Sequence, residues 1–253
     1  MMGMRRGAVT VLVGVIASGG CERVFDVASR EFADAPGTSP GAGIHLIQTT
    51  SHAWQHNETP TPIAFDNDVQ QGDLVVAMVA NFASTTTAVT DGIDDYQPSA
   101  METTTAGGTV MLYYAVAKET GHLIVTVAAV STDMSNEETS LILHDYRGAA
   151  AKPFDSATQT FGTGLNTPNE ITVGPLIAAA DNELMVVALA HDAFVTEVAE
   201  QPFQIEVIAV DNNQMNMPLA SADAIVPAGA TEATLTMTDR SGWAAVMVAF
   251  KPQ

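Results

Sequence analysis

An acidic loop is the most distinctive chemical feature of this chain. Asp91, Asp94 and Asp95 place three carboxylates within five residues, around Gly92, between two segments that we expect to be strands. Calcium takes six to eight oxygen ligands, and flexible loops supply them. We therefore predict Asp91, Asp94 and Asp95 as candidate ligands for Ca²⁺, the one cofactor to which the sequence points. The alternative is that these aspartates stabilise turns through hydrogen bonds to the backbone.

Two aromatic residues are candidates for stacking against a ligand. Trp54 lies between His52 and His56, outside any clear strand, and is the best candidate for an exposed ring. The two histidines are four residues apart, but the glutamate of an HExxH zinc motif is absent between them. Tyr96 follows the acidic loop. We predict Trp54 and Tyr96 as ligand-binding residues, with ordinary side-chain packing as the alternative.

No combination of residues forms a recognisable catalytic site in the sequence. Residues 37–41 match the pattern G-x-S-x-G, but they lie in a Pro- and Gly-rich segment without the strand and helix that a nucleophile elbow needs. Paired carboxylates for glycoside hydrolysis stay open, because the 29 acidic residues guarantee close pairs whose separation a sequence does not give. We predict no catalytic residue and favour a protein that is not an enzyme.

Cys21, the only cysteine, ends a segment with the form of a bacterial export signal. Two arginines precede an apolar run, and small residues lead directly into the cysteine. The segment resembles the lipobox of bacterial lipoproteins, which implies that Cys21 is lipidated and becomes the mature N-terminus. A free thiol on a flexible leader is the alternative. We expect a signal peptide at 1–20, a lipidated leader and flexible tether at 21–43, and a location anchored in the outer membrane or extracellular.

The charge balance excludes some partners. The chain has 9 Lys and Arg against 29 Asp and Glu, a net charge of −20. Such a surface repels phosphate backbones and anionic headgroups, so we expect no nucleic-acid binding and membrane contact through the lipid anchor alone. A single cysteine gives no internal disulfide, so stability must come from core packing and sheet hydrogen bonds.

Residues 44–253 read as strand after strand, separated by turn residues. Several runs are apolar on both faces, as in strands inside a packed two-sheet structure, and none of the longer ones has a helical period. We predict an all-β, jelly-roll-like two-sheet sandwich of about 10–12 strands. Residues 148–170 look like a long loop. The expected strands include 73–80, 110–116, 123–130, 139–146, 171–176, 184–190, 204–210, 231–237 and 243–250.

A weak internal echo relates the two halves of this domain. Residues 72–77 resemble 182–188, and residues 117–127 loosely resemble 227–237. Two half-motifs that share one core fit a pseudo-symmetric sandwich with repeated halves. Two independent domains of about 100 residues are the alternative, but no clear Pro/Gly-rich linker separates them. We therefore expect a single β-sandwich domain over 44–253.

Five short motifs follow one another in a characteristic order. They are GDLVV at 72–76, VTDG at 89–92 with Tyr96, YYA at 113–115, VTV at 125–127, and DYRG at 145–148 with Asp155. This order resembles the secreted bacterial β-sandwich modules whose pattern is roughly GDLLVV, VTDSxGNxY, WYA, TVTV and EYSG. Such modules are often appended to extracellular proteins and mostly lack a defined activity. The resemblance implies a secreted sandwich and transfers no catalytic residue.

Together these features lead us to expect a non-catalytic module for binding or adhesion, secreted or anchored at the cell surface. Its partner would be an extracellular polysaccharide or an envelope protein, with a glycan as the favoured ligand. Two alternatives come from other classes. One is a carbohydrate-active enzyme, such as a polysaccharide lyase or a glycosidase, and the other is a structural subunit of a surface assembly.

Overall fold

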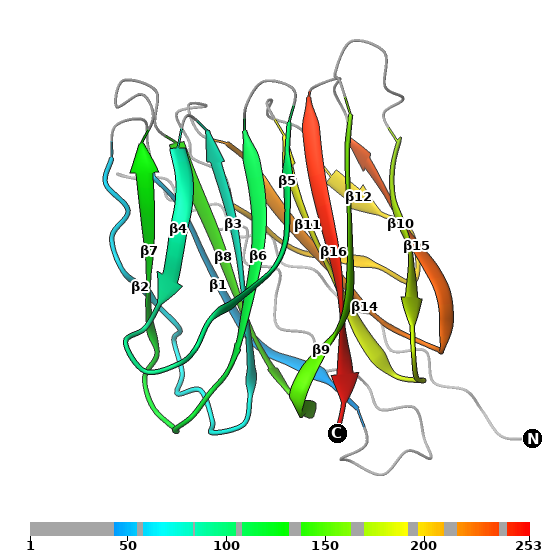
Figure 1. The fold of residues 1–253 in the computed structure, drawn as a ribbon, viewed down its shortest axis with the longest axis horizontal. Coiled ribbons are helices and arrows are strands. Elements are labelled where there is room, and N and C mark those ends of the chain that lie inside the picture. The colour runs from blue at the N-terminus through cyan, green and yellow to red at the C-terminus, as the bar shows by residue number, and fades with distance from the viewer. Residues whose placement is uncertain are drawn as a thin grey trace, which may run out of the picture.

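A computed structural model describes residues 43–54, 58–82, 84–104, 108–131, 138–162, 170–191, 197–209, 217–237 and 242–253. The predicted signal peptide, Cys21, nearly all of the predicted tether, and His56 lie outside the described residues. The described residues form sixteen strands and no helix (Figure 1). None of them therefore belongs to a helix that could cross a membrane.

The strands of residues 43–147 form what we call the first half. They are β1 (His45–Trp54), β2 (Ile63–Ala64), β3 (Leu74–Phe82), β4 (Ser84–Thr90), β5 (Gln97–Thr103), β6 (Thr109–Val116), β7 (Ile124–Ser131) and β8 (Glu138–Arg147). The remaining strands form the second half. They are β9 (Ala149–Gly162), β10 (Glu170–Ala178), β11 (Glu183–His191), β12 (Glu197–Ala199), β13 (Gln204–Ala209), β14 (Leu219–Val226), β15 (Gly229–Met237) and β16 (Trp243–Pro252).

The two halves have the same topology. The first half consists of a five-stranded sheet, β1-β8-β3-β6-β5, and a three-stranded sheet, β2-β7-β4. The second half consists of a five-stranded sheet, β9-β16-β11-β14-β13, and a three-stranded sheet, β10-β15-β12. Adding eight to each strand number of the first half gives both sheets of the second. The predicted repeated halves are thus confirmed at the level of strand order.

Each half is wound as a jelly roll. In the first half the first strand pairs with the eighth, the second with the seventh, and the third with the sixth, all antiparallel. The second half repeats these three pairings with β9–β16, β10–β15 and β11–β14. This nesting of first with last is the arrangement of an eight-stranded jelly roll. The predicted fold class is confirmed, although the number of strands is larger than expected.

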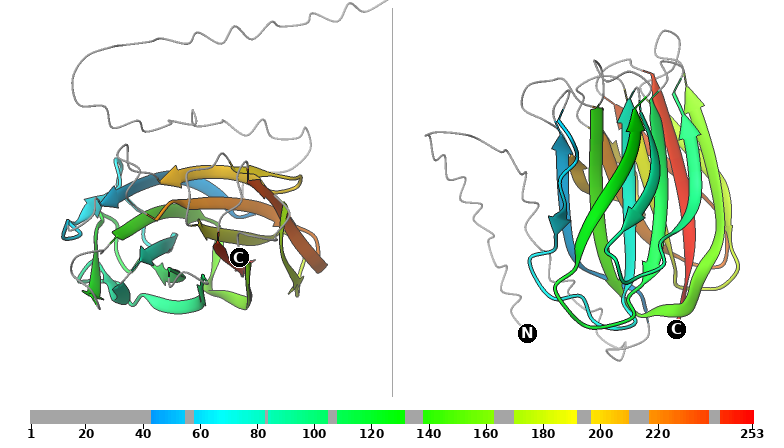
Figure 2. Two further views of the ribbon diagram at one scale, coloured as in Figure 1. Left: turned by 90° about the horizontal axis from the view of Figure 1, so that it is seen from above. Right: turned by 60° about the vertical axis from the view of Figure 1, so that its left-hand side comes forward.

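The four sheets stack as layers, with the five-stranded sheets in the middle. Figure 1 shows β2, β4 and β7 at one side of the molecule and β10, β12 and β15 at the other, and Figure 2 shows the same layers from above. One buried cluster lies between the two five-stranded sheets, and one more lies inside each half. The halves therefore share a central core, which the prediction of one domain requires.

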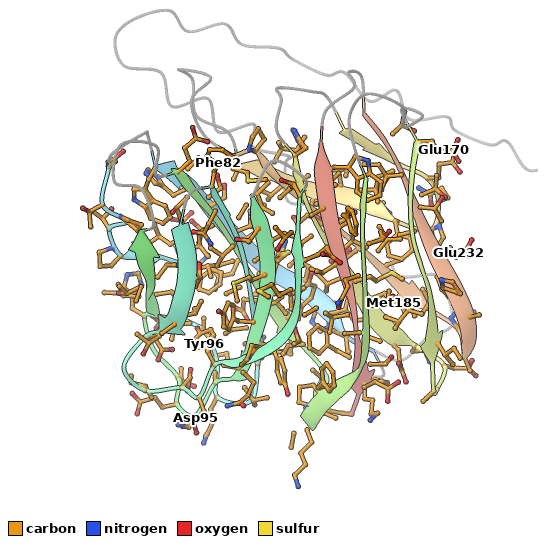
Figure 3. The ribbon with its side chains drawn as sticks, turned by 45° about the horizontal axis from the view of Figure 1, so that its top comes forward. Phe82, Asp95, Tyr96, Glu170, Met185 and Glu232 are labelled. Carbon is orange, nitrogen blue, oxygen red and sulfur yellow. The ribbon has the colours of Figure 1, made fainter. Side chains whose placement is uncertain are left out.

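Strands β3 and β11 show why the inner strands have apolar residues on both faces. Val76 and Met78 of β3 point into the central core, while Val75 and Ala77 point into the core of the first half. Strand β11 repeats this alternation between the central core and the core of the second half, where Met185 lies (Figure 3). Both faces of each strand are covered by another sheet, so neither face needs polar residues.

The two five-stranded sheets pack face to face with their strand orders running in opposite directions. Strand β5, at one edge of the first sheet, contacts β9, and β1, at the other edge, contacts β13. Because β9 is the counterpart of β1 and β13 the counterpart of β5, each half places its fifth strand beside the first strand of the other. This is the arrangement expected of a pseudo-twofold axis through the central core.

The turns that precede β3 and β11 have the same backbone conformation and the same hydrogen bond. Gly72 and Asn182 both have left-handed backbones, with φ of 92° and 65°. The next residue in each turn is a buried acid whose carboxylate accepts the backbone N–H three residues earlier. Asp73 accepts from Gln70 at 3.0 Å, and Glu183 accepts from Ala180 at 2.9 Å. The weak sequence echo at this position thus reflects a shared turn.

The sequence missed several strands, and β9 is the clearest correction. Residues 148–170 were expected to form a long loop, but β9 covers Ala149–Gly162. This strand lies at the edge of its sheet and pairs with β16 alone. An edge strand tolerates Pro153, which lacks an N–H, and it tolerates polar residues on its exposed face. Because of both features, the sequence of β9 does not have the apolar pattern by which the other strands were predicted.

Candidate functional site

The predicted acidic loop connects β4 to β5 and is held together by its own carboxylates. Oδ1 of Asp91 accepts the backbone N–H of Ile93 and of Asp94, both at 2.8 Å. Oδ1 of Asp94 accepts the backbone N–H of Lys118 at 2.8 Å. The ammonium of Lys118 donates to the carbonyl of Ile93 at 2.7 Å and lies 3.0 Å from Oδ2 of Asp95. The loop is thus fastened to the turn that follows β6.

These contacts serve turn formation, which was the alternative to a calcium site. Burial raises the pKa of Asp94, and the nearby carboxylate of Asp91 raises it further, while the N–H of Lys118 acts in the opposite direction. Within the described residues no three His, Cys, Asp or Glu side chains are grouped so that they could hold a metal ion. The calcium prediction for Asp91, Asp94 and Asp95 therefore stays a prediction without geometric support.

Tyr96 lies beside this loop, at one end of the first half (Figure 3). Its ring packs against the buried cluster of the first half. Its hydroxyl and Oδ2 of Asp91 are both enclosed without a hydrogen-bond partner among the described residues. Burial, together with the charges of Asp91 and Asp94, raises the pKa of Tyr96. Tyr96 contributes to the core, and its predicted role in ligand binding gains no support from this position.

The expectation that Trp54 is an exposed loop residue is wrong. Trp54 is the last residue of β1 and is 0% exposed. Its ring packs in the core of the first half, tilted against His52 at 4.9 Å, and its Nε1–H donates to Oγ1 of Thr61 at 3.2 Å. The large apolar area of an indole makes burial favourable once its N–H has an acceptor. Trp54 therefore has no free face for a ligand.

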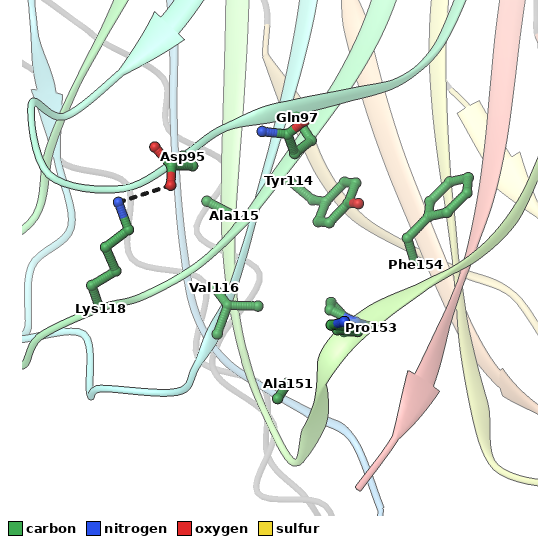
Figure 4. Close-up of a pocket in the computed structure, with 10 residues that line it drawn as sticks. Asp95, Gln97, Tyr114, Ala115, Val116, Lys118, Ala151, Pro153 and Phe154 are labelled. Atoms are coloured by element: carbon green, nitrogen blue, oxygen red, sulfur yellow. Dashed lines mark ion pairs between the residues drawn. The ribbon is translucent and has the colours of Figure 1, made fainter.

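A groove that the sequence did not predict lies where the two halves meet. It has a volume of about 460 Å³ and opens between β5 and β6 of the first half and the beginning of β9 (Figure 4). Ligand sites commonly have volumes of about 300–1,000 Å³. Six of its lining side chains could contact a ligand, namely Asp95, Gln97, Tyr114, Lys118, Lys152 and Phe154. We call this the aromatic groove.

Two aromatic rings from different halves form one wall of the aromatic groove. Tyr114 of β6 and Phe154 of β9 lie with their ring centroids 5.7 Å apart and their planes at 10°. Tyr114 also meets Phe250 of β16 edge-on, at 5.5 Å. Alternation along β6 places Tyr114 on the side of the central core, at whose edge the groove opens, because its neighbour Tyr113 packs in the core of the first half. Tyr114 and Phe154 are both half-buried, so they combine firm packing with an accessible surface.

Polar groups frame these rings. Gln97 is exposed at the start of β5, and Lys152 is exposed on β9. On the opposite side, Asp95 and Lys118 form the ion pair that fastens the acidic loop (Figure 4). The ammonium of Lys251 supports the wall from behind, because it donates to the carbonyl of Phe154 at 3.3 Å and pairs with Asp155 at 2.8 Å. Stacking surfaces, hydrogen-bonding groups and charges thus meet in one place.

The pseudo-twofold position of the aromatic groove is filled by different residues. Strand pairing makes Asp223 of β14 the counterpart of Tyr114, and Tyr146 of β8 the counterpart of Phe250. Tyr146 donates its hydroxyl to Oδ2 of Asp223 at 2.6 Å across the central core. The two halves share a backbone arrangement, but only the Tyr114 side has the stacked aromatic pair with Phe154.

Asp223 and His144, which lie between the halves, and Asp145, which lies on the other face of β8, have displaced pKa values. Burial, and then the charge of Glu206, raises the pKa of Asp223 to about 7, although the hydroxyl of Tyr146 acts in the opposite direction. Burial lowers the pKa of His144 to about 3, and this ring hydrogen-bonds Ser221 at 2.9 Å. Burial is also the main cause that raises the pKa of Asp145 to about 6. Displaced pKa values also mark functional sites, but here those of Asp223 and His144 belong to the packing between the halves, and that of Asp145 to its contacts inside the first half.

No protein-family model, curated protein or solved structure matches the chain. Comparisons with known proteins therefore do not assign the chain to a class of protein. The resemblance to secreted bacterial β-sandwich modules therefore stays a prediction. Sequence reasoning quoted Tyr113-Tyr114-Ala115 in that resemblance but gave Tyr114 no role. The groove itself had no sequence signal, since Tyr114 and Phe154 come from different halves.

Proposed function

We propose that the chain is a non-catalytic binding module for extracellular polysaccharide, with the aromatic groove as its ligand site. The observation that carries the proposal is the stacked pair of Tyr114 and Phe154 in a groove that also contains Gln97, Asp95 and Lys118. Sugar rings present apolar C–H faces that pack on aromatic rings, while their hydroxyls need donors and acceptors nearby. The aromatic groove offers both kinds of contact.

The lining favours binding over hydrolysis. Among the described lining residues Asp95 is the single carboxylate, whereas glycoside hydrolysis uses a pair of carboxyl groups on either side of the scissile bond. Asp95 is also engaged with Lys118. Export and lipidation at Cys21 belong to the same proposal and rest on the sequence. An extracellular polysaccharide ligand is consistent with that proposed location.

The experiment is a binding screen of the full mature chain against a panel of soluble polysaccharides by affinity electrophoresis. We expect retardation by at least one polymer, and loss of that retardation in Phe154→Ala. Gln97→Ala provides a second variant, because an exposed glutamine can be changed without disturbing the core. Phe161→Ala is the matched control, since Phe161 lies on the same strand and is 54% exposed.

Two results would overturn the proposal. One is the absence of binding to every polymer of the panel by a chain that melts cooperatively. The other is binding that survives both Phe154→Ala and Gln97→Ala, because a ligand of the aromatic groove would contact these side chains. Release of reducing ends from any polymer by the unmodified chain would favour the enzyme alternative instead.

A further inference from the structure

The described part of the chain has few cations, and two of them line the aromatic groove. It contains four Lys and Arg residues, namely Lys118, Arg147, Lys152 and Lys251. Lys118 and Lys152 line the groove, and Lys251 holds the carbonyl of Phe154 at its wall. The chain as a whole has a net charge of −20, so the sign of the charge at the groove differs from that of the chain.

Most of these cations are already neutralised by a nearby carboxylate. Arg147 forms a two-pronged pair with Asp73, at 2.8 and 2.9 Å. Lys118 pairs with Asp95 and Lys251 with Asp155. Lys152 differs, because it is exposed and makes no hydrogen bond or ion pair with any residue that the structure describes. The lining of the groove therefore has one ammonium in excess over its carboxylates.

We propose that the aromatic groove selects polysaccharides whose sugar units carry a carboxylate, and that Lys152 binds this carboxylate. The inference rests on the proposed function and narrows its ligand to uronate-containing polymers. Pro153 separates Lys152 from Phe154 on β9, and both side chains line the groove at the irregular start of this strand. A sugar stacked on Phe154 would thus have its acid group within reach of Lys152.

The negative charge of the whole chain does not prevent such binding. At physiological salt, exposed charges separated by more than about 8 Å are largely screened. The ligand therefore responds mainly to the groups in the groove, where Asp95 is already paired. The excess ammonium of Lys152 then determines the sign of the local charge.

The test compares polymers that differ only at the carboxyl group, which is ionised in one and esterified in the other. Oligogalacturonates and their methyl esters are titrated against the full mature chain by calorimetry at 150 mM salt. We expect the acid form to bind about fivefold tighter than the ester, which is the size of one exposed ion pair. Lys152→Gln should abolish this preference, and Lys152→Arg should retain it.

A matched control separates the local effect from net charge. Gln201→Glu adds one negative charge in an exposed turn before β13, the edge strand opposite β9, and should keep the preference. Equal affinity for acid and ester, or a preference that persists in Lys152→Gln, would overturn the inference while polymer binding itself stands. A preference for a sulfated galactan over its unsulfated form, without one for the uronate, would overturn the carboxylate assignment. If no polymer binds, the proposed function fails and the inference with it.

Discussion

Replacing Asp223 by asparagine should change how the stability of the protein depends on pH. Asp223 lies half-buried against the central core, and its carboxyl has a pKa of about 7 in the folded chain against 3.8 in the unfolded chain. The folded state therefore holds this proton more tightly. The resulting stabilisation is complete below about pH 3.8 and is lost as the pH rises through about 7. Asparagine has nearly the same shape but does not ionise, and its carbonyl can still accept the hydroxyl of Tyr146.

The size of the effect follows from the displaced pKa. One pKa unit corresponds to about 1.4 kcal/mol, so ionisation of Asp223 should cost the native state about 3 kcal/mol more at pH 8 than at pH 5. His144 acts in the opposite sense, because its lowered pKa removes stability as the pH falls below about 6.5. This contribution is common to both proteins and cancels in their difference.

The assay is urea denaturation of the unmodified chain and of Asp223→Asn at intervals from pH 5 to pH 8. We expect Asp223→Asn to gain about 3 kcal/mol relative to the unmodified chain across this window. Asp66→Asn, which changes an exposed acid of the first half, should show no such trend. A difference that stays constant within about 1 kcal/mol across the window would refute the reasoning, since it would show that Asp223 is charged throughout or is solvated.

Substitutions at three further positions test the structure. Tyr146→Phe should cost about 1–3 kcal/mol at pH 8, because the half-buried carboxylate of Asp223 loses its donor; an unchanged urea midpoint would contradict this. Trp54→Ala should cost about 3–5 kcal/mol through loss of core packing. It should leave the polysaccharide affinity of the folded fraction unchanged, whereas a selective loss of binding at unchanged melting temperature would restore Trp54 as a ligand residue. Gly72→Ala should cost about 1–2 kcal/mol, because only the left-handed backbone opposes the added methyl group. Gly72→Asn, which copies Asn182, should cost less than Gly72→Ala in the same denaturation assay.

The part of the fold that could be predicted from the sequence is the part with a local signal. Strands β3 and β11 were predicted because inner strands of a stack of sheets are apolar on both faces. Strand β9 was missed because it lies at an edge, where polar residues and Pro153 are tolerated. The weak echo between the halves was a correct sign of their repeated topology, although the sequence did not reveal that the five-stranded sheets face each other.

The candidate site was harder to predict because it depends on contacts between distant segments. The acidic loop was correctly identified as a feature, but its carboxylates bind backbone N–H groups and Lys118, which sequence spacing does not show. Trp54 was predicted to be exposed because β1, the strand that ends at this residue, was not recognised in the sequence. Tyr114 and Phe154 are 40 residues apart and meet only when the two halves pack together.

The connection between the halves consists of a single residue. Strand β8 ends at Arg147 and β9 begins at Ala149, so Gly148 alone joins the two jelly rolls. Its φ of 93° turns the chain, and a side chain at this position would collide with the carbonyl of Gly43. So short a link holds the second half at a very high effective concentration beside the first. The chain in effect contains both subunits of a dimer, so the packing of one half on the other does not depend on protein concentration. The residues at the two pseudo-twofold positions can therefore differ, as Tyr114 and Asp223 do.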